Sequence, residues 1–120
     1  MKIKTCVKPL SVNRAWQGNL FRSKDYLQYT NDLLLTLPKG RAPEGKLLVV
    51  YRFHIKNHKL ADWDNPIKPL QDVLVRAGIL PDDRFIYQSI VEKVPDEEEY
   101  AEIYIFPCPQ ESLSALLGYN

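Results

Sequence analysis

Apolar and polar residues alternate in two early segments of the chain. Residues 2–8 read KIKTCVK, where Ile3, Thr5 and Val7 alternate against lysines, and this pattern predicts a short strand. Residues 46–55 read KLLVVYRFHI and predict a longer strand. Because side chains alternate across a strand, Tyr51 and Phe53 are expected on one face and His54 on the other.

Two further segments repeat apolar residues at helical spacing. The first is predicted to be a helix over residues 23–37, with Ser23 as its N-cap. The second is predicted over residues 66–77, and Gly78 suits its C-cap. Pro69 lacks an N–H for an intrahelical bond, so we expect the first turn of the second helix to be irregular or to start late.

The C-terminal part of the chain predicts two more strands. They cover residues 85–94 and 100–106, and the acidic turn PDEEE between them suggests a hairpin. The predicted order is therefore β-α-β-α-β-β. We expect an α+β fold in a single domain over residues 1–120, with a mixed sheet and helices mainly on one face.

Composition agrees with a soluble globular protein, since 45% of the residues are hydrophobic and 26% are charged. No run approaches the roughly 20 apolar residues that a membrane span needs. The N-terminus lacks an apolar core, so we expect no signal peptide. Cys6 and Cys108 do not form a CxxC pair and are interpreted as reduced thiols, which predicts a cytoplasmic location.

The small net charge hides an asymmetry between the two halves of the chain. Residues 1–60 hold 12 cationic side chains and 3 acids, whereas residues 61–120 hold 4 and 12. This division suggests a basic surface for a polyanion beside an acidic site. Alternatively, the halves interleave in the fold and the charges mix.

The segment ADWDNPIKPLQD, residues 61–72, contains the main candidate chemistry. In extended chain, Asp62 and Asp64 share one face, while Trp63 is expected to point into the core. Lys68 and Asp72 continue the series at helical i, i+4 spacing. The simplest alternative is that these residues form ordinary ion pairs on a helix surface.

A second acid pair, Asp82 and Asp83, follows the predicted helix in a turn. A strand, a helix and a return turn are able to bring this pair near Asp62 and Asp64. Clustered carboxylates repel one another unless a cation lies between them, and Mg²⁺ prefers such oxygen ligands. A bound Mg²⁺ activates water and stabilises charge on a phosphoryl oxygen, and Lys68 is placed to assist.

Read as a whole, residues 62–93 resemble the signature of the RusA family of Holliday junction resolvases. The family pattern is D-x-D-N-x-x-K, then an Asp, a helix-ending Gly, a D-D pair and a Lys. The matching residues here are Asp62, Asp64, Asn65, Lys68, Asp72, Gly78, Asp82, Asp83 and Lys93. Upstream, the segment PLSVNRAW is similar to an early family loop through Pro9, Ser11, Asn13 and Trp16.

The resemblance implies a homodimeric endodeoxyribonuclease that resolves four-way DNA junctions in recombination and repair. It implies a dependence on Mg²⁺, with Mn²⁺ as a substitute. Asp62, Asp64 and Asp83 correspond to catalytic acids that bind the metal, and Lys68 corresponds to the catalytic lysine. The residues predicted to contact DNA are Asn13, Arg14, Lys59, Lys68 and Lys93.

Two other functions stay open at this point. One is a branched-DNA-binding protein with little or no cleavage activity, and the other is a non-catalytic interaction protein whose acids form only surface ion pairs. His54 and His58 lack the closed ligand set that zinc needs, so we expect them to be polar surface or DNA-facing residues.

Overall fold

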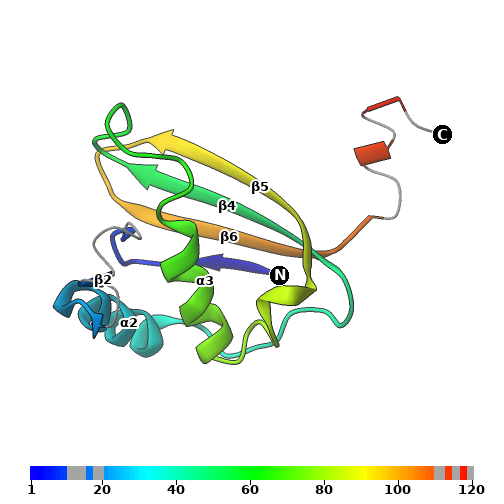
Figure 1. The fold of residues 1–120 in the computed structure, drawn as a ribbon, viewed down its shortest axis with the longest axis horizontal. Helices are drawn as coiled ribbons and strands as arrows, with labels where there is room; N and C mark the ends of the chain where they lie inside the picture. The colour runs from blue at the N-terminus through cyan, green and yellow to red at the C-terminus, as the bar shows by residue number, and fades with distance from the viewer. Residues whose placement is uncertain (11–15, 18–20, 110–112, 115–116, 119–120) are drawn as a thin grey trace.

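The computed structural model describes residues 1–10, 16–17, 21–109, 113–114 and 117–118 (Figure 1). The strands are β1 (Lys2–Lys4), β2 (Trp16–Gln17), β3 (Phe21–Arg22), β4 (Leu47–Ile55), β5 (Ile86–Pro95) and β6 (Tyr100–Pro107). The helices are α2 (Lys24–Thr36), α3 (Ile67–Arg76) and the short 3₁₀ helix η1 (Asp83–Phe85). The predicted α+β class and the order β-α-β-α-β-β are confirmed, with the small β2–β3 ribbon as an addition.

Four of the described strands form a mixed sheet in the order β1-β6-β4-β5 (Figure 1). β4 pairs in parallel with β5 and antiparallel with β6. The predicted hairpin between β5 and β6 is therefore wrong, because β4 lies between them. The crossover through α3 places β5 parallel to β4 on one side, and β6 then takes the free side of β4.

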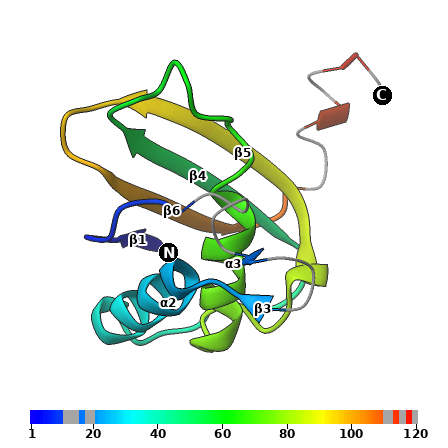
Figure 2. The ribbon, with the colours of Figure 1, turned by 60° about the vertical axis from the view of Figure 1, so that its left-hand side comes forward.

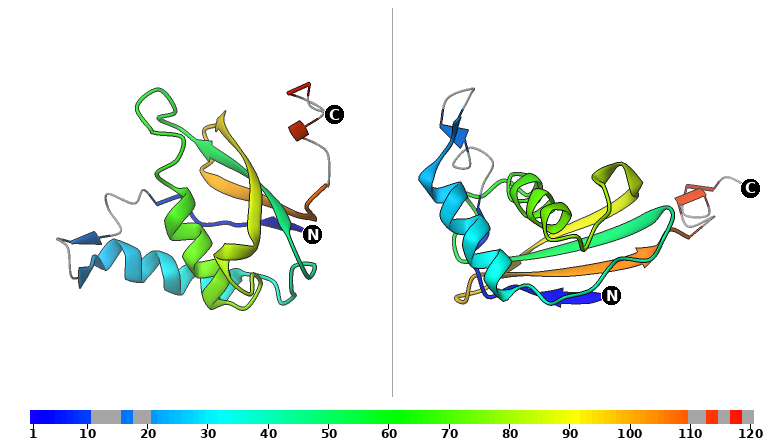
Figure 3. Two further views of the ribbon diagram at one scale, coloured as in Figure 1. Left: turned by 45° about the vertical axis from the view of Figure 1, so that its right-hand side comes forward. Right: turned by 90° about the horizontal axis from the view of Figure 1, so that it is seen from below.

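The core lies between one face of this sheet and the two helices. Tyr51 and Phe53 of β4 and Ile103 of β6 are fully buried on that face. They belong to one cluster with Leu33 of α2 and Leu74 of α3. Both helices lie on the side of the sheet that carries this cluster (Figures 2 and 3).

The helix ends follow from local chemistry. Ser23 caps α2 as predicted, because its Oγ accepts a hydrogen bond from the Tyr26 N–H at 3.1 Å. The other helix, α3, begins at Ile67, one residue later than expected. This start places Pro69 at the third helical position, where the N–H needs no intrahelical partner.

Gly78 ends α3 with a backbone that favours glycine, since its φ is +78°. The Gly78 N–H donates to the Val75 carbonyl at 3.0 Å, and the Ile79 N–H donates to the Leu74 carbonyl at 3.0 Å. This pair of bonds is a Schellman motif. Ile79 is buried against the core, so the motif turns the chain sharply towards the second acid pair.

Within the described part of the chain, no helix is long and apolar enough to cross a bilayer.

Candidate active site

The first acid pair lies in the loop of residues 56–66, between β4 and α3. Asp62 and Asp64 are exposed, and the Asn65 side-chain amide donates a hydrogen bond to Asp62 Oδ2 at 3.0 Å. Trp63 is 57% exposed, so the prediction that it enters the core is wrong. The loop runs over the surface, where no apolar layer covers the side chain between the two acids.

The second acid pair begins η1, just after the Schellman turn. Asp82 Oδ1 accepts a hydrogen bond from the Arg84 N–H at 3.0 Å, as an N-cap does. This bond holds the pKa of Asp82 below its usual value. Asp83 also lies near the buried Tyr51 hydroxyl, whose pKa is raised first by burial and then by the Asp83 charge.

Lys68 lies on α3 and faces the second acid pair. Its Nζ donates a hydrogen bond to Asp72 Oδ1 at 3.0 Å, which confirms the expected i, i+4 pair. This bond raises the pKa of Lys68, and the charges of Asp72 and Asp83 add to the effect. An open cavity of about 540 Å³ is lined by Tyr26, Lys68, Asp72, Val75, Arg76, Asp82 and Asp83.

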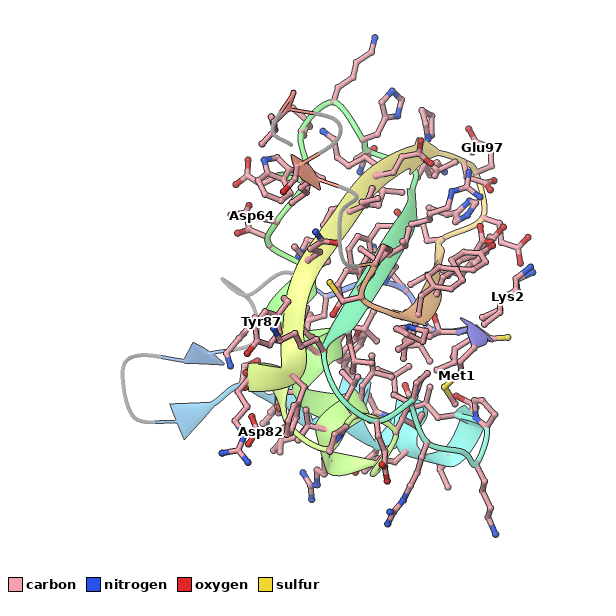
Figure 4. All side chains as sticks on the ribbon, turned by 90° about the vertical axis from the view of Figure 1, so that its right-hand side faces the viewer. Met1, Lys2, Asp64, Asp82, Tyr87 and Glu97 are labelled. Carbon is pink, nitrogen blue, oxygen red and sulfur yellow. The ribbon has the colours of Figure 1, made fainter. Side chains whose placement is uncertain are left out.

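The two acid pairs come from different segments, because Asp62 and Asp64 precede α3 and Asp82 and Asp83 follow it. Figure 4 shows Asp64 and Asp82 on the same side of the molecule but well apart. Asp62 lines a cavity of about 580 Å³, and Asp83 lines the other cavity described above. Over the described residues, no three His, Cys, Asp or Glu side chains are grouped so that they could hold a metal ion.

The chemistry of these donors nevertheless suits a hard divalent cation. In the described residues, Asp62, Asp64 and Asp83 form no ion pair with a cationic side chain. Mg²⁺ keeps several of its waters and often uses only one or two carboxylates. Asp62 and Asp64 therefore fit as ligands from one loop. Asp83 joins them only if the segments before and after α3 supply ligands to one ion.

The residues predicted to contact DNA have different surroundings. Asn13 and Arg14 lie outside the described residues. Lys59 is exposed on the same loop as Asp62. Lys93 is partly buried, and its Nζ donates hydrogen bonds to the carbonyl oxygens of His58 at 2.7 Å and Ala61 at 2.8 Å.

The sequence interpretation missed a polar cluster on the sheet face opposite the helices. His54 is 6% exposed, so the expectation that it lies at the surface is wrong. Its Nδ1 contacts Asp96 Oδ2 at 2.9 Å, and its Nε2 contacts Glu102 Oε1 at 2.6 Å. Both carboxyl groups have a pKa below the usual value. The main cause for Asp96 is a hydrogen bond from a backbone N–H, and the main cause for Glu102 is its hydrogen bond with His54.

The same face pairs cations from the first half of the chain with acids from the second. Arg52 Nε donates to Glu92 at 2.8 Å, and its Nη1 donates to Glu102 at 3.1 Å. At one end of the sheet, Lys8 pairs with Glu99 at 3.2 Å. In Figure 4, Lys2 and Glu97 lie on this side of the molecule, away from Asp64 and Asp82. The charged halves therefore interleave across the sheet.

One comparison with known proteins identifies the family. The family model described as Endodeoxyribonuclease RusA matches residues 8–106 of the 120-residue chain. The matched range contains both acid pairs, Lys68 and Lys93. No curated protein matches the sequence. Because the family model covers most of the chain, the protein belongs to the RusA family of endodeoxyribonucleases.

Proposed function

We propose that this protein is a homodimeric endodeoxyribonuclease that resolves four-way DNA junctions in recombination and repair. Action on Holliday junctions and a need for a divalent metal are general properties of the RusA family. The observation that carries the proposal for this chain is that Asp62, Asp64 and Asp83 have no ion-pair partner among the described residues. Mg²⁺ is the proposed metal, and Mn²⁺ is expected to replace it.

Asp62, Asp64 and Asp83 are the proposed ligands of the cation. When bound, a divalent cation supplies an activated water and neutralises charge on a phosphoryl oxygen. Asp62 and Asp64 come from one loop and Asp83 from η1, so three ligands of a single ion have to approach more closely than they do in this chain. The bond from Asn65 to Asp62 orients that carboxylate before the metal binds.

Lys68 is the proposed partner of the phosphate group. Its raised pKa keeps the ammonium protonated at neutral pH, and its side chain is 57% exposed at the cavity that Asp83 also lines. Asp72 holds Nζ by one hydrogen bond and leaves other N–H bonds for a phosphoryl oxygen. A positive group fixed at this place stabilises negative charge as the phosphodiester bond breaks.

The dimer and the DNA contacts extend the proposal beyond the single chain. A four-way junction is symmetric, so a two-fold dimer places one active site on each of two opposed strands. Asn13, Arg14, Lys59 and Lys68 are the proposed DNA contacts, whereas Lys93 is given a different role in the next subsection. Such phosphate contacts orient the DNA without reading its sequence, and they weaken as the salt concentration rises.

The test is a cleavage assay on a labelled synthetic four-way junction, with a linear duplex of the same sequence as control. Each substrate is incubated with the protein in Mg²⁺, in Mn²⁺ and in EDTA. We expect paired nicks in the junction only when metal is present, and little cleavage of the duplex. Equal cleavage of both substrates, or cleavage in EDTA, contradicts the proposal.

The separation of the two acid pairs supports a second candidate function. This is a branched-DNA-binding protein that does not cleave its substrate. It predicts that the junction is bound as tightly in EDTA as in Mg²⁺ and that no nicks appear in either condition. A gel-shift assay run beside the cleavage assay distinguishes the two functions.

A further inference from the structure

The ammonium group of Lys93 connects the sheet to the loop that carries the first acid pair. Nζ donates to the carbonyl oxygens of His58 and Ala61, at 2.7 and 2.8 Å. Both acceptors are backbone groups, and Ala61 directly precedes Asp62. The contact therefore joins the edge strand β5 to the backbone of loop 56–66, across 35 and 32 residues of sequence.

The sheet register explains why Lys93 points towards this loop. Lys93 is paired with Phe53 in the parallel β4–β5 ladder, and Phe53 is fully buried on the helix side of the sheet. Lys93 thus points to the same side, at the sheet edge, and is partly buried there. An ammonium group in such a place is costly unless it is hydrogen-bonded, and the two loop carbonyls supply charge-assisted bonds.

The other contacts that fix the loop lie at its two ends, where the Lys56 N–H donates to Glu99 Oε1 at 3.1 Å and Pro66 is buried. The N–H groups of Leu60 and Ala61 both bond to the Asn57 carbonyl, which is a contact inside the loop. Leu60 is 88% exposed and Trp63 is 57% exposed, so burial of these apolar side chains does not anchor the loop. Between these two ends, the long-range hydrogen bonds that the described residues give to the loop backbone come from Lys93.

We propose that Lys93 is a positioning residue, whose ammonium fixes the backbone of loop 56–66 and thereby places Asp62 and Asp64. This role differs from the direct phosphate contact that the sequence resemblance suggests. Two of the three N–H bonds of the ammonium are already directed at carbonyl oxygens, which leaves little of the group for DNA. The effect on catalysis rests on the proposed nuclease function, whereas the effect on the loop does not.

The test compares Lys93→Met with Lys59→Met, which removes an exposed lysine from the same loop. Amide hydrogen exchange over residues 57–67 is measured in both variants. Loss of the Lys93 ties is expected to speed exchange in this segment by about 10-fold, while Lys59→Met leaves it unchanged. Lys93→Arg retains a cationic donor and is expected to restore part of the protection.

Junction assays show whether the loop effect reaches the reaction. For Lys93→Met we expect the metal concentration at half-maximal cleavage to rise by about 10-fold, with junction affinity in EDTA changed by less than about 2-fold. For Lys59→Met we expect weaker junction binding in EDTA, with the metal concentration at half-maximal cleavage unchanged. If a urea titration shows that Lys93→Met is not folded in the absence of urea, Lys93→Gln replaces it in the same measurements.

The two proposals fail separately. Unchanged exchange in folded Lys93→Met, together with a loss of junction affinity, overturns the positioning role and makes Lys93 a DNA contact. Absence of cleavage by the unmodified protein overturns the nuclease function, but the exchange measurement still decides whether Lys93 fixes the loop.

Discussion

The acids on the two sides of the sheet have opposite surroundings. On the sheet face opposite the helices, called the open face below, Glu102 is 8% exposed and accepts hydrogen bonds from His54, Arg52 and the Tyr104 hydroxyl. On the helix side, Asp62 and Asp64 are exposed and have no cationic partner in the described residues. The difference indicates that Glu102 helps to hold the strands together, while Asp62 and Asp64 are available for a ligand.

The largest expected effect is on catalysis and comes from Asp64→Asn. The substitution removes one negative charge from an exposed loop, so cleavage of the junction is expected to fall by about 1,000-fold. Stability to urea is expected to change little, because no described residue bonds to this carboxylate. The measurement is junction cleavage in Mg²⁺, with a gel shift in EDTA as the control for binding.

The next effect is on stability and comes from Glu102→Ala on the open face. It leaves His54, Arg52 and Tyr104 without their shared acceptor, and we expect the free energy of unfolding to fall by about 2–3 kcal/mol. Glu92→Ala is the matched control, because Glu92 also pairs with Arg52 but is exposed. Equal losses of stability in the two variants would contradict the structural role of Glu102.

A smaller effect on catalysis is expected from Lys68→Met. The substitution keeps most of the side-chain length but removes the charge, so cleavage is expected to fall by about 10- to 100-fold. Its exposed pair with Asp72 contributes only a few tenths of a kcal/mol to helix stability. Parallel urea titrations and cleavage assays separate the two contributions, and a loss of stability as large as that of Glu102→Ala would contradict this division.

The smallest effect concerns pH. The pKa values of Glu102 and Asp96 are lowered in the folded protein, so their stabilising contribution is present above about pH 5 and is lost as the pH falls through the lowered values. Urea titrations from pH 7 to pH 3 are expected to show a steeper loss for the unmodified protein than for Glu102→Ala. Identical slopes would show that Glu102 does not contribute to this acid sensitivity.

The sequence predicted which segments form helices and strands better than it predicted which strands pair with one another. Local signals such as the Ser23 cap and Gly78 define helix ends, so α2 and α3 were predicted within one or two residues. The hairpin between β5 and β6 failed because strand order depends on which side of β4 each strand takes, and a short acidic turn does not determine this. Likewise, the alternation in β4 placed His54 opposite the core, but its burial depends on Asp96 and Glu102, far away in sequence.

One contact within the candidate site was predicted from the sequence. The pair Lys68–Asp72 follows from helical spacing alone, and the structure confirms it. The relation between Asp62, Asp64 and Asp83 depends on the path of the chain at both ends of α3, which spacing in the sequence does not define. The contact of Lys93 with the loop depends on the parallel register of β5, so it could not be predicted from the sequence either.

Binding of Mn²⁺ by calorimetry is the most direct test of the central claim that acids from both ends of α3 hold one cation. The unmodified protein is compared with Asp64→Asn and Asp83→Asn, and with Glu92→Gln as a control from the open face. We expect each of the first two substitutions to weaken binding by at least about 10-fold, and Glu92→Gln to leave it unchanged. Normal Mn²⁺ binding by Asp83→Asn would contradict the claim.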